Sequence, residues 1–147
     1  MKKTKFIPED LYHEILKNIP IICVDGIILK NDEVLLVLRD KEPEKNNWWF
    51  PGGRVLKNES LEEAILRKVK EETNLDCSVL EMFDVTQTYF NSGPNNIPVH
   101  TINICFTLTI KKGNLLLDDD HKGYGWFCSP PQDSSSTIKY IFKKLKK

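Results

Sequence analysis

The stretch from 51 to 75, PGGRVLKNESLEEAILRKVKEETNL, carries the clearest structural signal in the chain. A proline followed by two glycines indicates a turn, and Ser60 with Glu63 three positions later is the capping-box signature of a helix start. Apolar residues then recur at helical spacing along one face, at Leu61, Ala64, Ile65 and Val69. We expect a glycine turn and a helix that ends at Asn74, because asparagine tolerates the left-handed conformation that ends helices.

The carboxylates of this helix have two interpretations. Glu72 follows Ile65 by seven positions, so at about 100° per residue both point from the core-facing side. A carboxylate there needs a partner, and a divalent metal ion is one. The alternative is a solvated, ion-paired surface, since Arg67–Glu71 and Lys68–Glu72 are pairs of opposite charge four residues apart.

The rest of the chain predicts strands mixed with helices. Strands are expected over 21–29, 33–40, 48–50, 77–89, 99–110 and 124–128, the first two joined as a hairpin at Asn31-Asp32. Amphipathic helices are expected over Pro8–Ile19, within an N-terminal segment 1–19, and over 137–147. His121 is expected in a loop after three aspartates. The pattern predicts a single α/β or α+β domain over residues 1–147.

Composition excludes several classes of protein. The chain has 147 residues, with 21 Lys and Arg against 21 Asp and Glu, so it lacks the basic excess of a nucleic-acid binder. It has no apolar run of the ~20 residues that a membrane span needs, and its first residues do not resemble a signal peptide. Its four cysteines form no C-x-x-C pair. We therefore expect a reduced, cytoplasmic protein with no membrane or nucleic-acid partner.

The stretch resembles the Nudix box, G-x5-E-x7-R-E-U-x-E-E-x-G-U with U a bulky aliphatic residue, at Gly53, Glu59, Arg67, Glu71 and Glu72. The resemblance implies a Nudix fold, a mixed β-sheet sandwiched between α-helices, with the box loop and helix over 52–75. Two positions differ from the family pattern. Lys68 replaces a glutamate that is often a metal ligand or base, and Asn74 replaces the late glycine.

GDP-mannose mannosyl hydrolases are a Nudix branch that also lacks this glutamate. The chain is similar to them from about Ile19 to Trp126, including IPIICVDGIIL, VLLVLRDKEP and LLLDDDHKGYGW. In that branch water attacks the anomeric carbon of the sugar with inversion, and the nucleoside diphosphate leaves. The resemblance implies hydrolysis of a nucleotide sugar of the GDP-mannose kind, with Mg²⁺ as cofactor and Mn²⁺ as an alternative.

The resemblance also implies roles for single residues. The metal ligands would be Glu72, the Gly52 carbonyl and Asp120. His121 matches the base that activates water, a role that suits a neutral imidazole.

Other residues match the substrate-binding and structural parts of the branch. Arg39 and Arg54 would hold the diphosphate, Asp25 would face the positive charge that develops on the sugar, and Tyr124 would contact substrate. Glu59 and Arg67 would form an internal ion pair.

Two alternatives stay open. An ordinary Nudix diphosphatase would cleave P–O bonds of ADP-ribose or a nucleoside triphosphate, with Glu71 and Glu72 on the metal. A non-catalytic module would bind a nucleotide sugar without turnover. Thr88 and Thr101 stand where the mannosyl hydrolases have a histidine and a tyrosine, so another sugar is compatible with the pattern. The branch forms dimers, which makes a homodimer an expectation.

Overall fold

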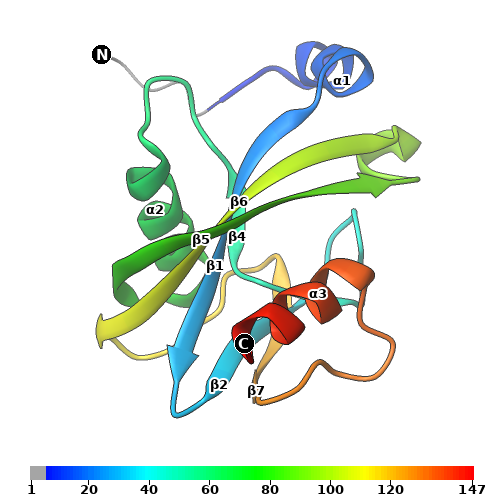
Figure 1. The fold of residues 1–147 in the computed structure, drawn as a ribbon. Coiled ribbons are helices and arrows are strands. Elements are labelled where there is room, and N and C mark those ends of the chain that lie inside the picture. The colour runs from blue at the N-terminus through cyan, green and yellow to red at the C-terminus, as the bar shows by residue number, and fades with distance from the viewer. Residues whose placement is uncertain (1–5) are drawn as a thin grey trace.

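The computed structural model describes residues 6–147 (Figure 1). Three α-helices, seven strands and a short 3₁₀ helix follow one another along the chain as α1 (Glu9–Asn18), β1 (Ile21–Lys30), β2 (Glu33–Arg39), β3 (Trp48–Trp49), β4 (Gly52–Arg54), α2 (Leu61–Thr73), β5 (Asp76–Phe90), η1 (Pro94–Asn96), β6 (Val99–Lys112), β7 (His121–Phe127) and α3 (Ser136–Leu145). The expected mixture of strands with three helices is confirmed. Residues 1–5 of the expected N-terminal segment lie outside the described range.

The strands form one mixed sheet in the order β3-β2-β1-β6-β5, with β4 paired to β1 and β7 paired to β2. β1 and β6 run parallel, and every other pair is antiparallel. The hairpin turn between β1 and β2 places Asn31 and Asp32 at positive φ, as its Asn-Asp sequence predicts.

Helices pack on both faces of the sheet because successive side chains of β1 point to opposite sides. Val24 and Ile28 belong to a core shared with Ile65 and Val69 of α2. Ile27 belongs to a second core, with the α3 residues Ile138, Ile141 and Phe142. The expected α+β architecture, a mixed sheet between helices, is therefore present (Figure 1).

The caps of α2 follow the sequence signals. The Ser60 side chain accepts a hydrogen bond from the Glu63 backbone, and the Glu63 side chain accepts one from the Ser60 backbone. Asn74 ends the helix in the left-handed conformation, with φ 65°. Glu72 lies on the buried side of this helix, with 5% of its surface exposed.

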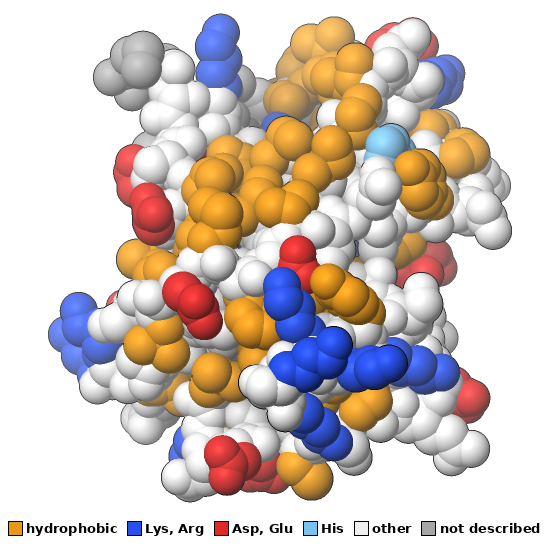
Figure 2. Space-filling model, in the orientation of Figure 1, with side chains coloured by type: hydrophobic (Ala, Val, Ile, Leu, Met, Phe, Trp, Pro, Cys, Tyr) orange, Lys and Arg blue, Asp and Glu red, His pale blue; other side chains and the backbone are white. Residues whose placement is uncertain are grey.

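The last helix is basic on its outer side. Figure 2 shows Lys and Arg side chains gathered over α3, while hydrophobic side chains cover much of the upper part of the same face of the molecule. The inner side of α3 is apolar and fully or almost fully buried. This agrees with the basic amphipathic helix that the sequence predicts at this end of the chain.

Two local predictions were wrong. Residues 52–54, expected as a turn, form β4, which pairs with 23–25 of β1. His121, expected in a loop, is the first residue of β7, because that strand extends back to pair with Arg39. Within the described residues all four cysteines are free thiols, and no helix there is long and apolar enough to cross a membrane.

Candidate active site

A cavity of about 290 Å³ opens where α1, the N-terminal half of β1, β4 and the end of α2 meet. Most of the charged residues selected from the sequence lie in its wall, although they come from distant parts of the chain. The cavity is lined by Asp25, Arg39, Gly52, Arg54, Glu72, Asp120 and His121. The fold therefore gathers carboxylates and arginines around one space.

The Glu72 side chain binds the backbone of β4. Its Oε1 accepts a hydrogen bond of 2.9 Å from the Gly52 backbone N–H. A Cβ on Gly52 would lie 2.1 Å from the Val24 carbonyl oxygen, so only glycine fits where β4 crosses β1. Burial raises the pKa of the Glu72 carboxyl, and the positive charge of Lys68 opposes that rise. The Glu72 carboxylate thus connects α2 to β4.

His121 is held by Asp118. The ring Nδ1 lies 2.7 Å from Asp118 Oδ1, and the His121 side chain is 2% exposed. An ionised carboxylate only accepts hydrogen bonds, so in a neutral imidazole this contact favours the tautomer with the proton on Nδ1. The contact with Asp118 therefore fixes the orientation of the imidazole at the wall of the cavity.

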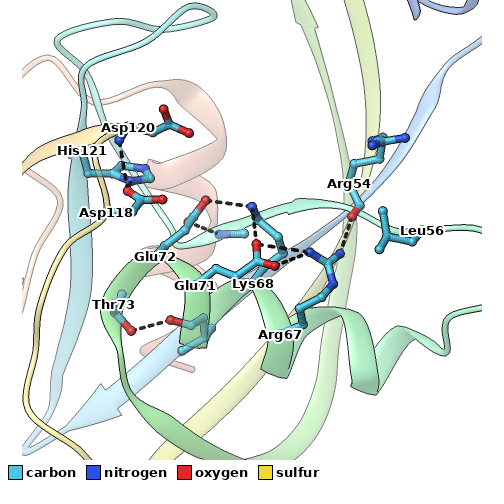
Figure 3. Close-up of polar contacts among 12 residues, drawn as sticks. Arg54, Leu56, Arg67, Lys68, Glu71, Glu72, Thr73, Asp118, Asp120 and His121 are labelled. Atoms are coloured by element: carbon cyan, nitrogen blue, oxygen red, sulfur yellow. Dashed lines mark hydrogen bonds and ion pairs between the residues drawn. The ribbon is translucent and has the colours of Figure 1, made fainter. Parts of the chain in front are cut away.

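Glu72, Asp118 and His121 form a compact group (Figure 3). One ligand atom from each lies within 4.8 Å of the other two. Two carboxylates at this separation suit an ion that prefers oxygen ligands, such as Mg²⁺ or Mn²⁺. The donor set of this chain thus fits a divalent metal.

Two arginines also line the cavity. Arg39 donates from Nε to the Pro43 carbonyl oxygen at 2.7 Å, which orients its guanidinium. Arg54 stacks its guanidinium over the Tyr12 ring at 5.4 Å from the ring centroid. Both arginines line the cavity, where a bound diphosphate would meet two planar donor groups.

Asp25 is buried in β1 at the centre of the sheet, with 3% of its surface exposed. Desolvation raises the pKa of its carboxyl to about 7, although hydrogen bonds from Asn103 and Trp49 oppose the rise. Asn103 Nδ2 donates to Asp25 Oδ2 at 3.0 Å.

A buried polar chain continues from Asn103 toward the edge of the sheet. Asn103 Oδ1 accepts from Thr101 at 2.7 Å, and Thr101 lies 2.5 Å from Thr88, hydroxyl to hydroxyl. Thr88 and Thr101, which stand where the mannosyl hydrolases have a histidine and a tyrosine, therefore form a hydrogen bond with each other.

Arg67 joins the box helix to the box loop. It forms a two-point ion pair with Glu59, Nε to Oε2 at 2.7 Å and Nη2 to Oε1 at 3.0 Å. It also donates to the Arg54 carbonyl oxygen and to Glu71. The Glu59 carboxylate is completely buried and additionally accepts from the Leu56 N–H. These contacts of Arg67 hold the end of β4, where Arg54 lies, against α2.

The comparison with known families agrees with this arrangement. The model of the NUDIX domain matches residues 21–133, most of the chain. The chain belongs to the Nudix family. The match includes β4, the box helix α2 and His121, so the cavity described above is the candidate active site of a Nudix hydrolase.

Similar proteins include one named for glycan biosynthesis and one named as an ADP-ribose pyrophosphatase. The low-salt glycan biosynthesis protein Agl8 of Haloferax volcanii is 32% identical over 90% of this chain and 85% of its own length. An ADP-ribose pyrophosphatase of Methanocaldococcus jannaschii is 38% identical over 74% of this chain and 62% of that protein. The fold matches the crystal structure of a MutT NUDIX hydrolase from Burkholderia pseudomallei with a TM-score of 0.77 at 22% identity, over 87% of this chain and 99% of that one.

Three residues selected from the sequence lie apart from the compact group of this Nudix site. Asp120 lines the cavity, but its carboxylate is half exposed and lies 3.8 Å from the Lys41 ammonium. The Glu71 carboxylate contacts Arg67 and Lys68. Tyr124 is half exposed on β7 and does not line the cavity.

Two residues of the site were not selected from the sequence. Asp118 is one of the three aspartates before His121, and the turn between them brings its carboxylate to the imidazole. No sequence motif marks Asn103. Its hydrogen bond to Asp25 depends on the pairing of β1 with β6, in which Asn103 lies opposite Cys23.

Proposed function

We propose that this Nudix hydrolase cleaves a nucleotide sugar, of the GDP-mannose kind, in the presence of Mg²⁺ or Mn²⁺. The observation that carries the proposal is the pairing of His121 with Asp118 at a cavity that also holds Arg39 and Arg54. An oriented imidazole, when neutral, can act as the general base for attack by water. The similarity to a protein named for glycan biosynthesis supports a sugar-linked substrate.

The proposed reaction uses His121 as the base. Its Nε2 takes a proton from water, the water oxygen bonds to the anomeric carbon, and the bond from that carbon to the phosphate oxygen breaks. The nucleoside diphosphate leaves with the bonding electron pair, and Arg39 and Arg54 neutralise its charge. Asp25 faces the positive charge that develops on the sugar.

The carboxylates of Glu72 and Asp118 would hold the divalent ion, with Asp120 and the Gly52 carbonyl as further candidate ligands. When bound, the ion would neutralise charge on the diphosphate.

A second candidate is hydrolysis at phosphorus, which the relative named as an ADP-ribose pyrophosphatase favours. It would use the same cavity and the same arginines, but water would attack a phosphate and release a nucleoside monophosphate and a sugar phosphate. The two reactions differ in the atom that water attacks, the anomeric carbon or phosphorus, and they share the substrate class.

Incubation with GDP-mannose and Mg²⁺ in ¹⁸O-labelled water separates the two. We expect ³¹P NMR to detect GDP without an isotope shift, and mass spectrometry to find ¹⁸O in the free sugar. GMP with mannose 1-phosphate, and ¹⁸O on phosphorus, would overturn attack at carbon in favour of the second candidate. If GDP-mannose is not cleaved, the same assay with other nucleotide sugars and ADP-ribose tests the substrate class. Binding without turnover of any of them would contradict both reactions.

A further inference from the structure

We propose that Tyr12 of α1 is a positioning residue of the substrate site, which holds the Arg54 guanidinium in the orientation that binds a diphosphate. This role rests on the proposed binding of a diphosphate by Arg54, but it does not depend on which bond of the substrate is cleaved. α1 (Glu9–Asn18) precedes residues 21–133, the segment that matches the NUDIX domain. A helix outside that match is thereby assigned a role in substrate binding.

Tyr12 and Arg54 meet in the wall of the cavity. Arg54 Cζ lies over the Tyr12 ring, 5.4 Å from its centroid, and both residues line the cavity. The cation–π contact of Lys30 with Trp126, by comparison, lies outside the cavity wall. Burial raises the pKa of the Tyr12 hydroxyl above its ordinary value, although the charge of Arg54 opposes the rise. The phenol is therefore neutral, and it attracts the guanidinium through the face of its ring.

The packing of α1 sets the position of the ring. Leu16 follows Tyr12 by four residues, so both side chains lie on the same side of the helix. Leu16 is buried in a small core with Ile21, Ile97 and Val99, and Tyr12 packs against this core. The apolar contacts of α1 with the sheet therefore place the Tyr12 ring at the cavity.

Arg54 is contacted from two helices. Its carbonyl oxygen accepts a hydrogen bond of 3.0 Å from Arg67 Nη2, which connects its backbone to α2. Its guanidinium contacts the Tyr12 ring, which connects its side chain to α1. Arg54 has a further interaction within the protein, so Tyr12 contributes one part of its orientation. A ring face needs no N–H donor from the guanidinium, so this contact does not compete with a phosphate as a carboxylate partner would.

Two competing interpretations predict different ligand binding. In the first, Tyr12 is only an apolar contact of an amphipathic helix, and its replacement by leucine leaves the affinity for ligands unchanged. In the second, the Tyr12 ring stacks on the nucleobase, as aromatic side chains do with nucleic-acid bases. Loss of the ring would then weaken a nucleoside diphosphate and leave a diphosphate without a base unaffected.

The test is binding of two ligands to the full chain in Mg²⁺, measured by isothermal titration calorimetry. The ligands are the α,β-methylene analogue of GDP and methylenediphosphonate, whose P–C–P bonds resist hydrolysis. Tyr12→Leu keeps the apolar packing and removes the ring. It should weaken both ligands by a similar factor, roughly 3- to 10-fold, the size of a partly shielded cation–π contact. Tyr12→Phe keeps the ring and should stay within about twofold of the wild type.

Tyr89→Leu is the matched control, because it removes the same ring from an exposed residue that does not line the cavity. A double-mutant cycle tests whether Tyr12 acts through the arginine. In the Arg54→Met background, Tyr12→Leu should cause no further loss of affinity, because the cation that it positions is gone. Circular dichroism confirms that each variant is folded, and Tyr12→Met replaces Tyr12→Leu if the latter is not.

Three results would overturn the positioning role. They are equal affinities of Tyr12→Leu and Tyr89→Leu, an undiminished loss in the Arg54→Met background, and a loss confined to the GDP analogue, which would favour base stacking. A wild-type chain that binds neither ligand would overturn it together with the diphosphate role of Arg54. The titration involves no turnover, so its failure and a failure of the proposed reaction are distinguishable.

Discussion

The Nδ1 of His121 lies 2.7 Å from the Oδ1 of Asp118, three residues earlier in the chain, and both groups lie beside Glu72. The backbone favours this contact, because the His121 N–H also donates to the Asp118 carbonyl oxygen across the same turn, at 3.4 Å. The proposed base and the group that orients it thus lie within four consecutive residues, and each of the two can be tested separately.

Replacement of His121 by glutamine should reduce kcat by about 10²–10⁴-fold, the usual contribution of a general base, with a smaller effect on KM. Steady-state kinetics on the cleaved nucleotide sugar measure this. His100→Gln is the control, since that ring stacks on Tyr89 away from the cavity at 4.4 Å between centroids. Near-normal turnover by His121→Gln would exclude the imidazole as base.

Replacement of Asp118 by asparagine should disturb the tautomer of His121, because an amide can donate to Nδ1 and a carboxylate cannot. We expect ¹⁵N NMR of metal-free wild-type protein to find the proton on Nδ1, and the variant to contain a mixture of tautomers. The exposed neighbour Asp119 supplies the control variant, Asp119→Asn. Identical imidazole spectra for Asp118→Asn and the wild type would contradict the orienting role.

The fold was largely predictable from local patterns. Ser60 and Glu63 cap α2, and Asn74 ends it, through contacts within a few residues, which a sequence displays directly. β4 has only three residues and no periodicity, so its identity as a strand comes from pairing with β1. The start of β7 at His121 likewise depends on Arg39, a residue far away in the sequence.

The site was predictable where a charge interrupts an apolar pattern. Asp25 in an apolar strand and Glu72 on the apolar face of a helix both lie in the cavity wall. Three consecutive aspartates are equivalent as sequence, and only the turn geometry decides that Asp118 contacts His121. Asn103 is a neutral polar residue in a strand, and its contact with Asp25 follows from the register between β1 and β6.

Replacement of Arg67 by methionine should lower the free energy of unfolding by about 3–5 kcal/mol, because the fully buried Glu59 carboxylate would lose its two-point ion pair with Arg67. Urea unfolding followed by circular dichroism measures the change. The double variant Arg67→Met/Glu59→Gln removes both charges and should be less destabilised than Arg67→Met alone. A double variant that is no more stable than the single one would show that the buried charge is not the cause.

Replacement of Gly52 by alanine should destabilise the chain by roughly 1–3 kcal/mol, the usual range for an overpacked site. The new Cβ would lie 2.1 Å from the Val24 carbonyl oxygen and 2.7 Å from Asp25 Oδ1, so β4 must move. Gly123→Ala is the matched control, because its nearest contact, Leu38, is 3.7 Å away. Thermal unfolding of the two variants compares them, and equal melting temperatures would contradict the close approach at Gly52.

Replacement of Asp25 by asparagine should change how stability depends on pH. Burial raises the pKa of Asp25 in the folded chain to about 7, above its ordinary value of 3.8. The folded state therefore holds this proton more tightly than the unfolded state, and ionisation removes stability as pH rises from about 4 to 7.

The asparagine at this position cannot ionise, so its stability relative to the wild type should increase across that range and level off above pH 7. At about 1.4 kcal/mol per unit of pKa, the gain should reach roughly 2–4 kcal/mol. Urea unfolding in EDTA at several pH values measures it, with Asp119→Asn as the exposed control. A difference between Asp25→Asn and wild type that stays constant from pH 4 to pH 8 would mean that Asp25 is not destabilised by its burial.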